Sequence, residues 1–571
     1  MNMIIERQSN INEEEVLKIE KQYGASKNLA RFLVGRNLSS KIIKALLGDY
    51  VLPKHNNITN LEEGAMLIAS YLEKENGAIY VYADYDSDGV NSGFIASDCL
   101  NKLKEALNSK CHVEVYFPNR CDGYGLSLEW CKKLVDKNKE EKKDILVVTV
   151  DNGITKKIES EYLLKNNIEV LITDHHYPKK DEVPEDVLVI NPWLHKDTES
   201  FGLCGAGVTY KLFAYLLEDI YKDESNYHLY YLPNVTIATV TDMMPLTVEN
   251  IQYMKYGFYL IENNHCSKGI SYYKERKNIN YLSTKEIAFS LGPQLNACGR
   301  MSKTELAGQF LLEEDEDSVA DSYRLMSKIN DERKKFQNDL LEEIESNLNI
   351  NDNTRFIIAH NDNIGGVGGI IAGKLVEKYK LPCMVLGGSN NLLHGSARST
   401  GGLDLHKLFE EEVSKGNILN FGGHKEAAGV EIDKNKIAKL QESLDERLKD
   451  FVYEESTLIS DIIVDELITL RDLNKDRHDM TKDIPLIGDL ANHLYAIKGL
   501  KVLSARKSKN NPNHICLSVT DGTTTKNIWA WNFYDKFMSL PTHEEISLIG
   551  SIVVDFMNPN CYTFNIEQII N

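Results

Sequence analysis

The sequence predicts an α/β protein centred on a doubly wound parallel sheet, and three features of the chain support this fold class. Short apolar or β-branched runs recur from residue 78 onwards, helix-like stretches separate them, and acidic residues follow several of the runs. Strands that alternate with helices are typical of a parallel sheet covered on both faces. After this domain we expect a long connecting helix, a second α/β domain and a small β-rich, OB-like domain.

The composition limits the classes of protein to consider. The chain has 571 residues, enough for several domains, and its 65 basic and 85 acidic residues give a formal charge of −20. This charge argues against a surface coated with positive charge for bulk nucleic-acid binding, although a local basic groove is compatible with it. The ten cysteines include no Cys-x-x-Cys pair, which disfavours a zinc ribbon and favours free thiols in a reducing compartment.

The sequence contains no pattern of a targeting or membrane segment. Its N-terminus does not resemble a signal peptide, and no run of about 18 apolar residues occurs in the chain. We therefore expect a soluble, cytoplasmic protein that acts as a monomer and has no membrane partner.

The first two predicted domains are an N-terminal helical cap, residues 1–75, and the parallel-sheet domain, residues 76–300. Helix-like segments in the second domain include 126–138 and 158–166. The predicted strands are 79–83, 112–117, 145–150, 169–173 and 187–190. Ligands of such sheets bind beyond the carboxyl ends of the strands, so residues that follow a strand are the first candidates for a site.

A charged helical connector is predicted for residues 301–350. Apolar residues at helical spacing favour a long helix between two lobes, and a solvated surface helix is the alternative. The apolar positions are Leu325, Ile329, Phe336, Leu340 and Ile344.

The last two predicted domains are residues 351–452, which are glycine-rich and of α/β character, and residues 453–571, which alternate β-type runs with turns. In the latter, Trp529, Trp531 and Phe533 alternate, so they would share one face of a strand. Such a face is either a platform on which nucleic-acid bases stack or a part of the domain core.

Acidic residues at predicted strand ends are the main functional signal. Asp84 and Asp86 follow the first strand, Asp151 follows the third, and Asp174-His175-His176 follows the fourth; Asp242 is expected at a further strand end. Carboxylates with imidazole suit Mn²⁺ or Mg²⁺, and a pair of such ions cleaves phosphodiesters. A single aspartate at a strand end is usually a helix cap or turn former, but four such signals in order favour a metal site.

These motifs resemble the DHH phosphoesterase superfamily, and within it the RecJ family of single-strand-specific DNA exonucleases. The resemblance covers about residues 75–435 and rests on the four acidic motifs in their order along the chain. The segment 422–429, Gly-Gly-His-Lys-Glu-Ala-Ala-Gly, resembles the signature of the DHH-associated domain. The resemblance therefore implies a DHH catalytic domain at 76–300 and a DHH-associated domain at 351–452.

The resemblance also implies roles for the residues of the acidic motifs. Two divalent ions, Mn²⁺ or Mg²⁺, would be held by a set in which Asp151 bridges the ions. Asp174 would orient a histidine, and His176 would lie near the scissile phosphate. Asp88 is expected to support the cluster rather than bind an ion. The implied metal ligands are Asp84, Asp86, Asp151, His175 and Asp242.

A substrate groove is implied by further segments that resemble those of the family. Arginine forks pair phosphate oxygens, and glycines let backbone amides approach phosphates closely. The alternatives are interdomain salt bridges for the arginines, a buried position for the tyrosine and tight packing for the glycines. The implied substrate-binding residues are Arg120, Tyr124, Asn296, Arg300, Gly366, Ser396, Arg398, Gly422, Gly423 and His424.

The chain departs from the family pattern at two places in this groove. Asn363-Ile364 stand where RecJ proteins usually carry Trp-His, and Gln294 stands where an arginine is common. Both departures concern substrate length and dependence on a 5′-phosphate rather than the metal ligands.

The resemblance implies a single-stranded-DNA-specific 5′→3′ exonuclease that releases 5′-mononucleotides in DNA repair and recombination, with a helicase or single-strand-binding protein as partner. One alternative is a short-oligonucleotide or cyclic-dinucleotide phosphodiesterase, but Tyr80 replaces the histidine typical of that branch. Another is a non-catalytic, DNA-binding DHH relative, which would have lost the acidic ligands that this chain keeps.

Overall fold

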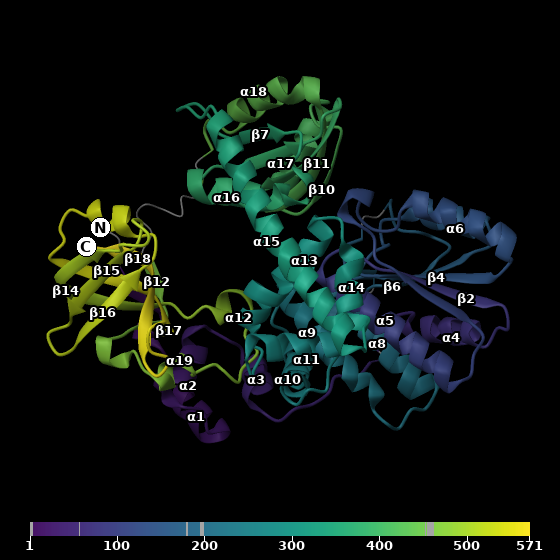
Figure 1. Cartoon of the computed structure of the whole chain (residues 1–571), viewed down its shortest axis with the longest axis horizontal. Coiled ribbons are helices and arrows are strands. Elements are labelled where there is room, and N and C mark those ends of the chain that lie inside the picture. Colours follow the sequence, from purple (N-terminus) through teal and green to yellow (C-terminus); the bar gives the residue numbers. More distant parts are fainter. Residues whose placement is uncertain (1–3, 56, 179–180, 195–198, 452, 454–461) are drawn as a thin grey trace.

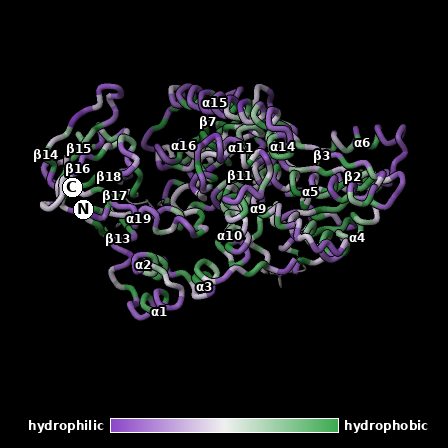
Figure 2. Tube along the Cα trace, turned by 60° about the horizontal axis from the view of Figure 1, so that its bottom comes forward, coloured by the Kyte–Doolittle hydropathy of each residue, from purple (hydrophilic) through white to green (hydrophobic). Residues whose placement is uncertain are grey.

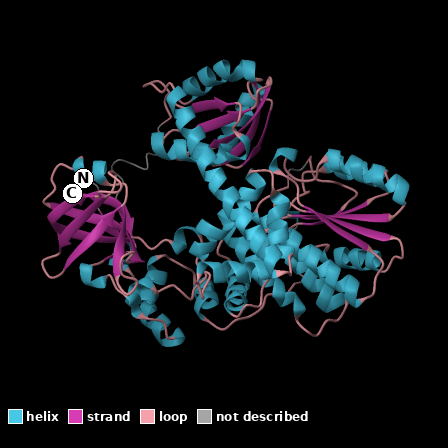
Figure 3. Ribbon diagram, viewed as in Figure 1, coloured by secondary structure: helices cyan, strands magenta, loops and turns pink. Residues whose placement is uncertain are grey.

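The computed structural model describes residues 4–55, 57–178, 181–194, 199–451, 453 and 462–571. Three larger sheets, a two-stranded sheet and a helical middle region make up the described part of the chain (Figures 1 and 3). None of the helices in these ranges combines the length and the apolar character that a membrane span requires.

We call residues 77–312 the DHH-like region. Its central sheet is parallel throughout, which confirms the predicted fold class. The strand order β3-β2-β4-β5-β6 places the first strand between the second and the third, so the direction of winding changes between β2 and β4. The strands are β2 (Gly77–Tyr82), β3 (His112–Tyr116), β4 (Asp144–Val150), β5 (Glu169–Thr173) and β6 (Leu188–Ile190).

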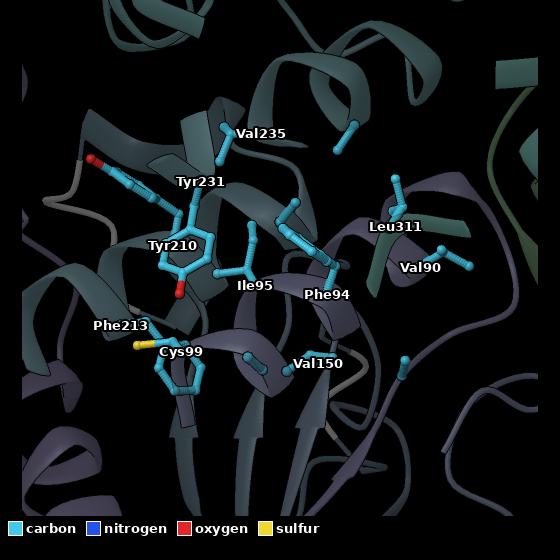
Figure 4. Close-up of a cluster of buried hydrophobic side chains, with 14 of the residues drawn as sticks. Val90, Phe94, Ile95, Cys99, Val150, Tyr210, Phe213, Tyr231, Val235 and Leu311 are labelled. Carbon is cyan, nitrogen blue, oxygen red and sulfur yellow. The ribbon is translucent and has the colours of Figure 1, made fainter. Parts of the chain in front are cut away.

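Helices cover both faces of this sheet because alternate strand residues point to opposite sides. Ile79 and Val81 pack with the helices on one face, and Tyr80 and Tyr82 pack with those on the other. Figure 4 shows part of the first core, where Phe94 and other side chains of α5 meet residues of α8 and α9. The first face carries α4 (Leu61–Leu72), α5 (Ser87–Ala106), α8 (Gly205–Tyr215) and α9 (Leu232–Thr241), and the second carries α6 (Leu128–Glu141) and α7 (Lys157–Lys165).

The N-terminal region contains the expected helices and one strand that was not expected. Asn12, Ser26 and Ser39 cap the first three helices with their side-chain oxygens. Strand β1 pairs in parallel with β12 of the C-terminal lobe, and Arg36 Nε lies 2.5 Å from Asp465 Oδ1. The elements are β1 (Ile4–Glu6), α1 (Glu13–Tyr23), α2 (Lys27–Gly35), α3 (Ser40–Leu47) and β12 (Ile462–Val464).

Helix α15 (Glu316–Asn347) links the DHH-like region to the second α/β region and is largely hydrophilic (Figures 1 and 2). The predicted apolar stripe is correct at its C-terminal end, where Leu340 and Ile344 are buried. It is wrong at Leu325, which is exposed, because Met326 faces the core instead. The helices before α15 are α10 (Val248–Glu262), α11 (Lys268–Lys277), α12 (Thr284–Glu286), α13 (Gly292–Arg300) and α14 (Thr304–Leu312).

The second α/β region has a mixed sheet of order β10-β11-β9-β8-β7, in which only β7 and β8 run parallel. The glycine-rich segment 422–429 forms the hairpin between β10 and β11. The elements are β7 (Ile357–Asn361), α16 (Gly368–Tyr379), β8 (Cys383–Gly387), β9 (Leu392–Arg398), α17 (Leu405–Ser414), β10 (Asn420–Gly423), β11 (Ala427–Asp433) and α18 (Ile437–Arg447).

The C-terminal lobe is a curved antiparallel sheet whose edge strands β16 and β18 contact each other. Trp529 and Trp531 stack at 5.5 Å on its outer side, and Trp531 is 44% exposed, so a core position is wrong for Trp531. Phe533 lies beyond the strand and is buried. The strands are β13 (Glu466–Leu467), β14 (Tyr495–Lys507), β15 (Ile515–Thr520), β16 (Thr525–Ala530), β17 (Glu545–Val554) and β18 (Tyr562–Ile570).

Candidate metal centre and substrate cleft

The acidic motifs meet at one edge of the parallel sheet. Asp84 and Asp86 follow β2, Asp151 follows β4, and the 174–176 motif follows β5. The expectation of a strand end is wrong for Asp242, which is the C-cap of helix α9. The end of α9 nevertheless brings Asp242 Oδ2 to 3.7 Å from His175 Nε2.

Carboxylate oxygens and imidazole nitrogens, the atoms with which these residues could bind metal ions, lie close together at this edge of the sheet. One carboxylate oxygen each of Asp84, Asp86 and Asp151 lie within 4.8 Å of one another, as do ligand atoms of Asp88, His175 and Asp242. His175 Nε2 joins the two groups, because it also lies 3.2 Å from Asp151 Oδ1. The structure thus brings all five implied metal ligands into one cluster.

The cluster is strongly acidic, and its members Asp84, Asp88 and Asp151 are buried, whereas Asp242 is exposed at its rim. Burial and repulsion from neighbouring carboxylates raise the pKa of Asp84 and Asp151 well above the usual range. The same two causes raise the pKa of Asp242 to about 8. Burial lowers the pKa of His175 to about 3, so its imidazole is neutral and able to bind a metal.

Two buried oxygens of the cluster support the presence of cations. Asp84 Oδ1 and Asp151 Oδ1 have no hydrogen-bond partner within the described part of the chain. Buried polar atoms are normally satisfied, and divalent ions would satisfy these and cancel the repulsion. Asp151 also has a positive φ of 63°, a strained conformation of the kind that persists at functional sites. The donor set therefore fits Mn²⁺ or Mg²⁺.

Asp174 lies behind the cluster and holds His176 in place. Its Oδ2 accepts a hydrogen bond from Ile154 N at 2.9 Å, and its Oδ1 accepts from His176 N at 3.0 Å and from His176 Nδ1 at 2.8 Å. Tyr124 Oη lies 2.9 Å from the same Nδ1. Burial opposes protonation of His176, but the Asp174 charge outweighs it and raises the pKa of His176 to about 9. His176 is therefore a cation at neutral pH.

Asp88 is engaged by backbone amides. Its two oxygens accept hydrogen bonds from Gly205 N and Ala206 N, both at 2.7 Å, at the start of α8. A Cβ at Gly205 would lie 2.3 Å from Asp151 Oδ1, so only glycine lets α8 approach the cluster this closely. Asp88 and Gly205 together hold α5, α8 and the cluster in register.

A cleft of about 1400 Å³ separates this edge from the second α/β region. Arg120, Tyr124, His176 and Arg300 line its DHH-like side. The opposite side comes from the second α/β region, and its sequence-predicted residues are Gly366, Ser396, Gly422, Gly423 and His424. Most of the implied substrate-binding residues therefore face one open space next to the acidic cluster.

Two of the implied substrate-binding residues do not line this cleft. Asn296 Oδ1 accepts from Ser87 N at 2.8 Å, so it fixes the start of α5 and faces a second pocket that Arg300 shares. Arg398 donates through Nη1 to Ala397 O at 2.9 Å, and Gly369 leaves room for its Nη2, to which a Cβ there would lie at 2.8 Å. Arg398 therefore lies beside Ser396 on the same face of β9, packed against Gly369 rather than lining the cleft.

Arg300 and Gly366 show how closely the two regions meet. Arg300 Nη1 donates to Gly366 O at 2.9 Å, and a Cβ at Gly366 would lie 2.6 Å from Arg300 O. Gly366 is thus needed for tight packing, one of the alternatives for the glycines. Among the described residues, no carboxylate lies within 4.0 Å of the guanidinium groups of Arg120, Arg300 or Arg398, so none forms an interdomain salt bridge there.

Several residues in or beside the site were missed from the sequence. Trp193 is not part of the cleft lining, but its Nε1 donates to His175 O at 2.9 Å; it follows a different strand, and no local pattern marks it. His394, His406 and Lys407 line the cleft from the second α/β region. His394 had a usable signal, because it stands two residues before Ser396 on the same strand and therefore on the same face.

Comparisons with known proteins find similarity to DHH-family domains and to RecJ exonucleases. Residues 78–239 match the family model of the DHH family, N-terminal domain, and residues 353–450 match that of the DHHA1 domain. The chain is 26% identical to the single-stranded-DNA-specific exonuclease RecJ of Haemophilus influenzae, over 81% of each chain. It is 27% identical to the Bacillus subtilis protein of that name, over 84% of this chain and 59% of the relative.

Solved structures of similar fold include two RecJ proteins. The structure of RecJ in complex with Mn²⁺ from Thermus thermophilus matches 100% of this chain and 79% of that chain, with a TM-score of 0.79 and 22% identity. A structure of exonuclease RecJ bound to manganese matches 71% of this chain and 98% of that chain, with a TM-score of 0.59 and 26% identity.

Proposed function

We propose that this chain, a RecJ-like member of the DHH phosphoesterase superfamily, degrades single-stranded DNA from its 5′ end to 5′-mononucleotides by metal-dependent hydrolysis. The observation that carries the proposal is the acidic cluster of five implied ligands beside an open cleft lined by arginines. The relatives named above are described as single-stranded-DNA-specific exonucleases, which supports the same substrate. We place the activity in DNA repair and recombination in the cytoplasm, with a monomeric enzyme that works beside a helicase or single-strand-binding protein.

The metal ligands in this proposal are Asp84, Asp86, Asp151, His175 and Asp242, with Asp151 between the two ions. When bound, Mn²⁺ or Mg²⁺ supplies Lewis-acid activation of water and of the scissile phosphate. The buried, mutually repelling carboxylates favour binding of such ions, because each ion removes repulsion that burial makes costly.

His176 acts on the substrate side of the cluster. Its imidazolium lines the cleft, and Asp174 and Tyr124 fix the ring through its Nδ1. From this position it donates to a phosphoryl oxygen as negative charge develops there. Because Asp174 stabilises the protonated ring, the donor is in place before the substrate arrives.

The arginines provide the recognition of the strand end. Burial, and then repulsion from Arg120, lower the pKa of both Arg300 and Arg398, so three guanidinium groups lie within electrostatic reach of one another. Such a cationic group favours a terminal phosphate over a neutral end. We therefore assign 5′-phosphate binding to Arg120, Arg300 and Ser396, with Arg398 adding charge from its place beside Ser396.

The proposal is tested with matched substrates and Mn²⁺. Single-stranded DNA labelled at its 5′ end should release labelled mononucleotide at once, whereas 3′-labelled strands should shorten gradually; matched RNA and a cyclic dinucleotide should react more slowly. The Asp151→Asn variant is the control for a contaminating nuclease. Digestion that starts at the 3′ end would refute the polarity, and faster cleavage of the cyclic dinucleotide would favour the phosphodiesterase alternative.

A further inference from the structure

A second cluster of metal-ligand side chains lies away from the sheet edge. His55 belongs to the strap, defined as the described residues 48–55 and 57–60 between α3 and α4. Glu218 lies in the π-helical turn Leu216–Ile220 after α8, and His228 lies in the 3-10 turn Tyr227–Tyr231. One ring nitrogen of each histidine and one oxygen of Glu218 lie within 4.8 Å of one another.

The contacts within this cluster converge on the carboxylate. His55 Nε2 lies 2.6 Å from Glu218 Oε2, and His228 Nδ1 lies 3.3 Å from Glu218 Oε1. The two imidazole rings meet edge-on, with centroids 5.2 Å apart, and Tyr210 lies 6.1 Å from each. Three segments that are distant in sequence therefore bring two imidazoles and a carboxylate to one point.

The two histidines are buried, and three of their four ring nitrogens lack a hydrogen bond within the described residues; the exception is His55 Nε2, which lies 2.6 Å from Glu218 Oε2. His228 is 0% exposed and His55 is 8% exposed. Neither ring nitrogen of His228 forms a hydrogen bond with any described residue, and the same is true of His55 Nδ1. Buried imidazole nitrogens normally bind a donor, an acceptor or a metal ion. The nitrogens without a hydrogen bond therefore indicate that this cluster binds a further group.

The ligand chemistry differs from that of the acidic cluster. Two imidazoles with one carboxylate form a set typical of Zn²⁺, in which a fourth position stays open for water. Oxygen-rich sets such as the acidic cluster favour Mg²⁺ or Mn²⁺ instead. Glu218 is 30% exposed in its side chain, so an ion and a fourth ligand can reach this site from solvent. A π-helical turn at Glu218 is also a feature often retained at functional sites.

We propose that His55, Glu218 and His228 bind a divalent ion of the Zn²⁺ class at a site that is distinct from the acidic cluster. Gly205 at the start of α8 touches the acidic cluster, whereas Glu218 follows the end of that helix, thirteen positions later. A helical rise of 1.5 Å per residue separates the two sites by roughly 20 Å. The second site does not depend on the proposed nuclease function.

The ion would fasten the strap that joins the N-terminal helices to the DHH-like region. The strap already contacts that region through Tyr50, which stacks on Tyr256 at 4.6 Å, and through the Lys54 carbonyl, which accepts from Lys211 Nζ at 2.9 Å. An ion on His55 would add a further attachment and hold α1–α3 in position. Loss of the ion should therefore expose the strap to proteases before other segments.

The test uses the full-length chain with Asp84→Asn and Asp151→Asn, which disable the catalytic cluster. The chelator-treated protein is incubated with Zn²⁺, desalted and analysed for bound metal, and Co²⁺ serves as a spectroscopic probe. We expect one retained Zn²⁺ per chain, a tetrahedral Co²⁺ absorption spectrum and slower cleavage of the strap by protease. Absence of retained Zn²⁺ in this background would overturn the proposal without any further variant.

Variants within the cluster identify the ligands. In the same background, His228→Asn and Glu218→Gln should each weaken Zn²⁺ binding by more than the roughly 10–100-fold that the loss of a supporting partner costs. Asp219→Asn, at the adjacent exposed carboxylate, is the matched control and should retain Zn²⁺. Because Glu218 is partly exposed, Glu218→Gln remains informative if His228→Asn fails to fold. Equal Zn²⁺ retention in Glu218→Gln and Asp219→Asn would contradict the assignment.

Discussion

The two walls of the cleft are built in opposite ways. The catalytic wall, made of the acidic cluster with Tyr124 and His176, has a buried base at Asp84, Asp88 and Asp151 and is held by strand ends, backbone amides and side-chain hydrogen bonds. The recognition wall, made of Ser396, Gly422, Gly423 and His424, is an exposed or half-exposed hairpin and strand of the second α/β region. Chemistry thus depends on groups fixed within tenths of an ångström, whereas recognition depends on backbone surface that can adapt to a flexible strand.

Because the two walls differ in this way, substitutions in one wall should affect different substrates from substitutions in the other. Changes in the catalytic wall should reduce hydrolysis of every substrate, since they remove groups that act on the phosphate itself. Changes in the recognition wall should affect long or 5′-phosphorylated strands and spare a small model diester.

The largest effect is expected for Asp151→Asn, because it removes the carboxylate that both halves of the acidic cluster share. The loss of several kcal/mol of metal-dependent stabilisation corresponds to a decrease in kcat/KM on the order of 10³-fold, on both DNA and a small diester. Steady-state assays with Mn²⁺ measure it, with Asp136→Asn on the exposed face of α6 as the matched control. Near-normal activity would disprove the metal assignment.

A smaller effect on the same wall is expected for His176→Gln. Loss of the positioned cation should lower kcat on the order of 10²-fold on all substrates, because one donor to the developing charge is missing. Mn²⁺ binding, measured by calorimetry, should be nearly unchanged. A loss of metal affinity instead of turnover would move His176 from the substrate side to the ligand set.

Arg398→Ala tests the recognition wall. A direct charge-assisted phosphate contact is worth about 1.5–3 kcal/mol, and Arg398 adds charge without lining the cleft, so kcat/KM for 5′-phosphorylated DNA should fall by at most roughly 10-fold. Hydrolysis of a small diester should stay the same. Arg447→Ala, on an exposed helix of the same region, is the control. Equal losses on DNA and the small diester would contradict the division between the walls.

Trp531→Ala tests whether recognition extends to the C-terminal lobe. Base stacking is worth about 1–3 kcal/mol, so the KM for long strands should rise by roughly tenfold or somewhat more, while short oligonucleotides should be unaffected. The matched variant is Trp193→Phe, which leaves the C-terminal lobe intact and should show no such length dependence. Identical effects on short and long strands would place Trp531 outside the DNA path.

Protonation of His493, which lies far from both walls of the cleft, should change the stability of the protein and leave DNA recognition unchanged. Burial lowers the pKa of His493 to about 4, near the contact of the N-terminal helices with the C-terminal lobe. Because the unfolded state binds this proton first, the stability that neutral His493 contributes is present above about pH 6.5 and is lost as pH falls towards 4. Thermal unfolding of His493→Gln should be less sensitive to pH over that window. An equal slope in both proteins would refute this origin.

The parallel sheet and its acidic edge were predictable because they rest on local patterns. Buried strands such as β4 are continuous apolar runs, and the residue after each strand falls at one edge whatever the details of packing. Asp84, Asp151 and Asp174 could therefore be placed together from the sequence.

Features that depend on partners far away in sequence were not predictable. Asp242 reaches the cluster from a helix end, and β1 exists because β12 offers it an edge at the other end of the chain. Trp531 is exposed because it lies in the turn just after β16, and periodicity alone does not specify where that strand ends. Likewise, Trp193 reaches His175 only through the folded arrangement of β5 and β6.

The central claim is most directly tested by anomalous diffraction from crystals grown with Mn²⁺. The account predicts two manganese peaks within bonding distance of Asp84, Asp86, Asp151, His175 and Asp242, with Asp151 between them. Peaks at other places, or none at this cluster in crystals of active enzyme, would contradict it.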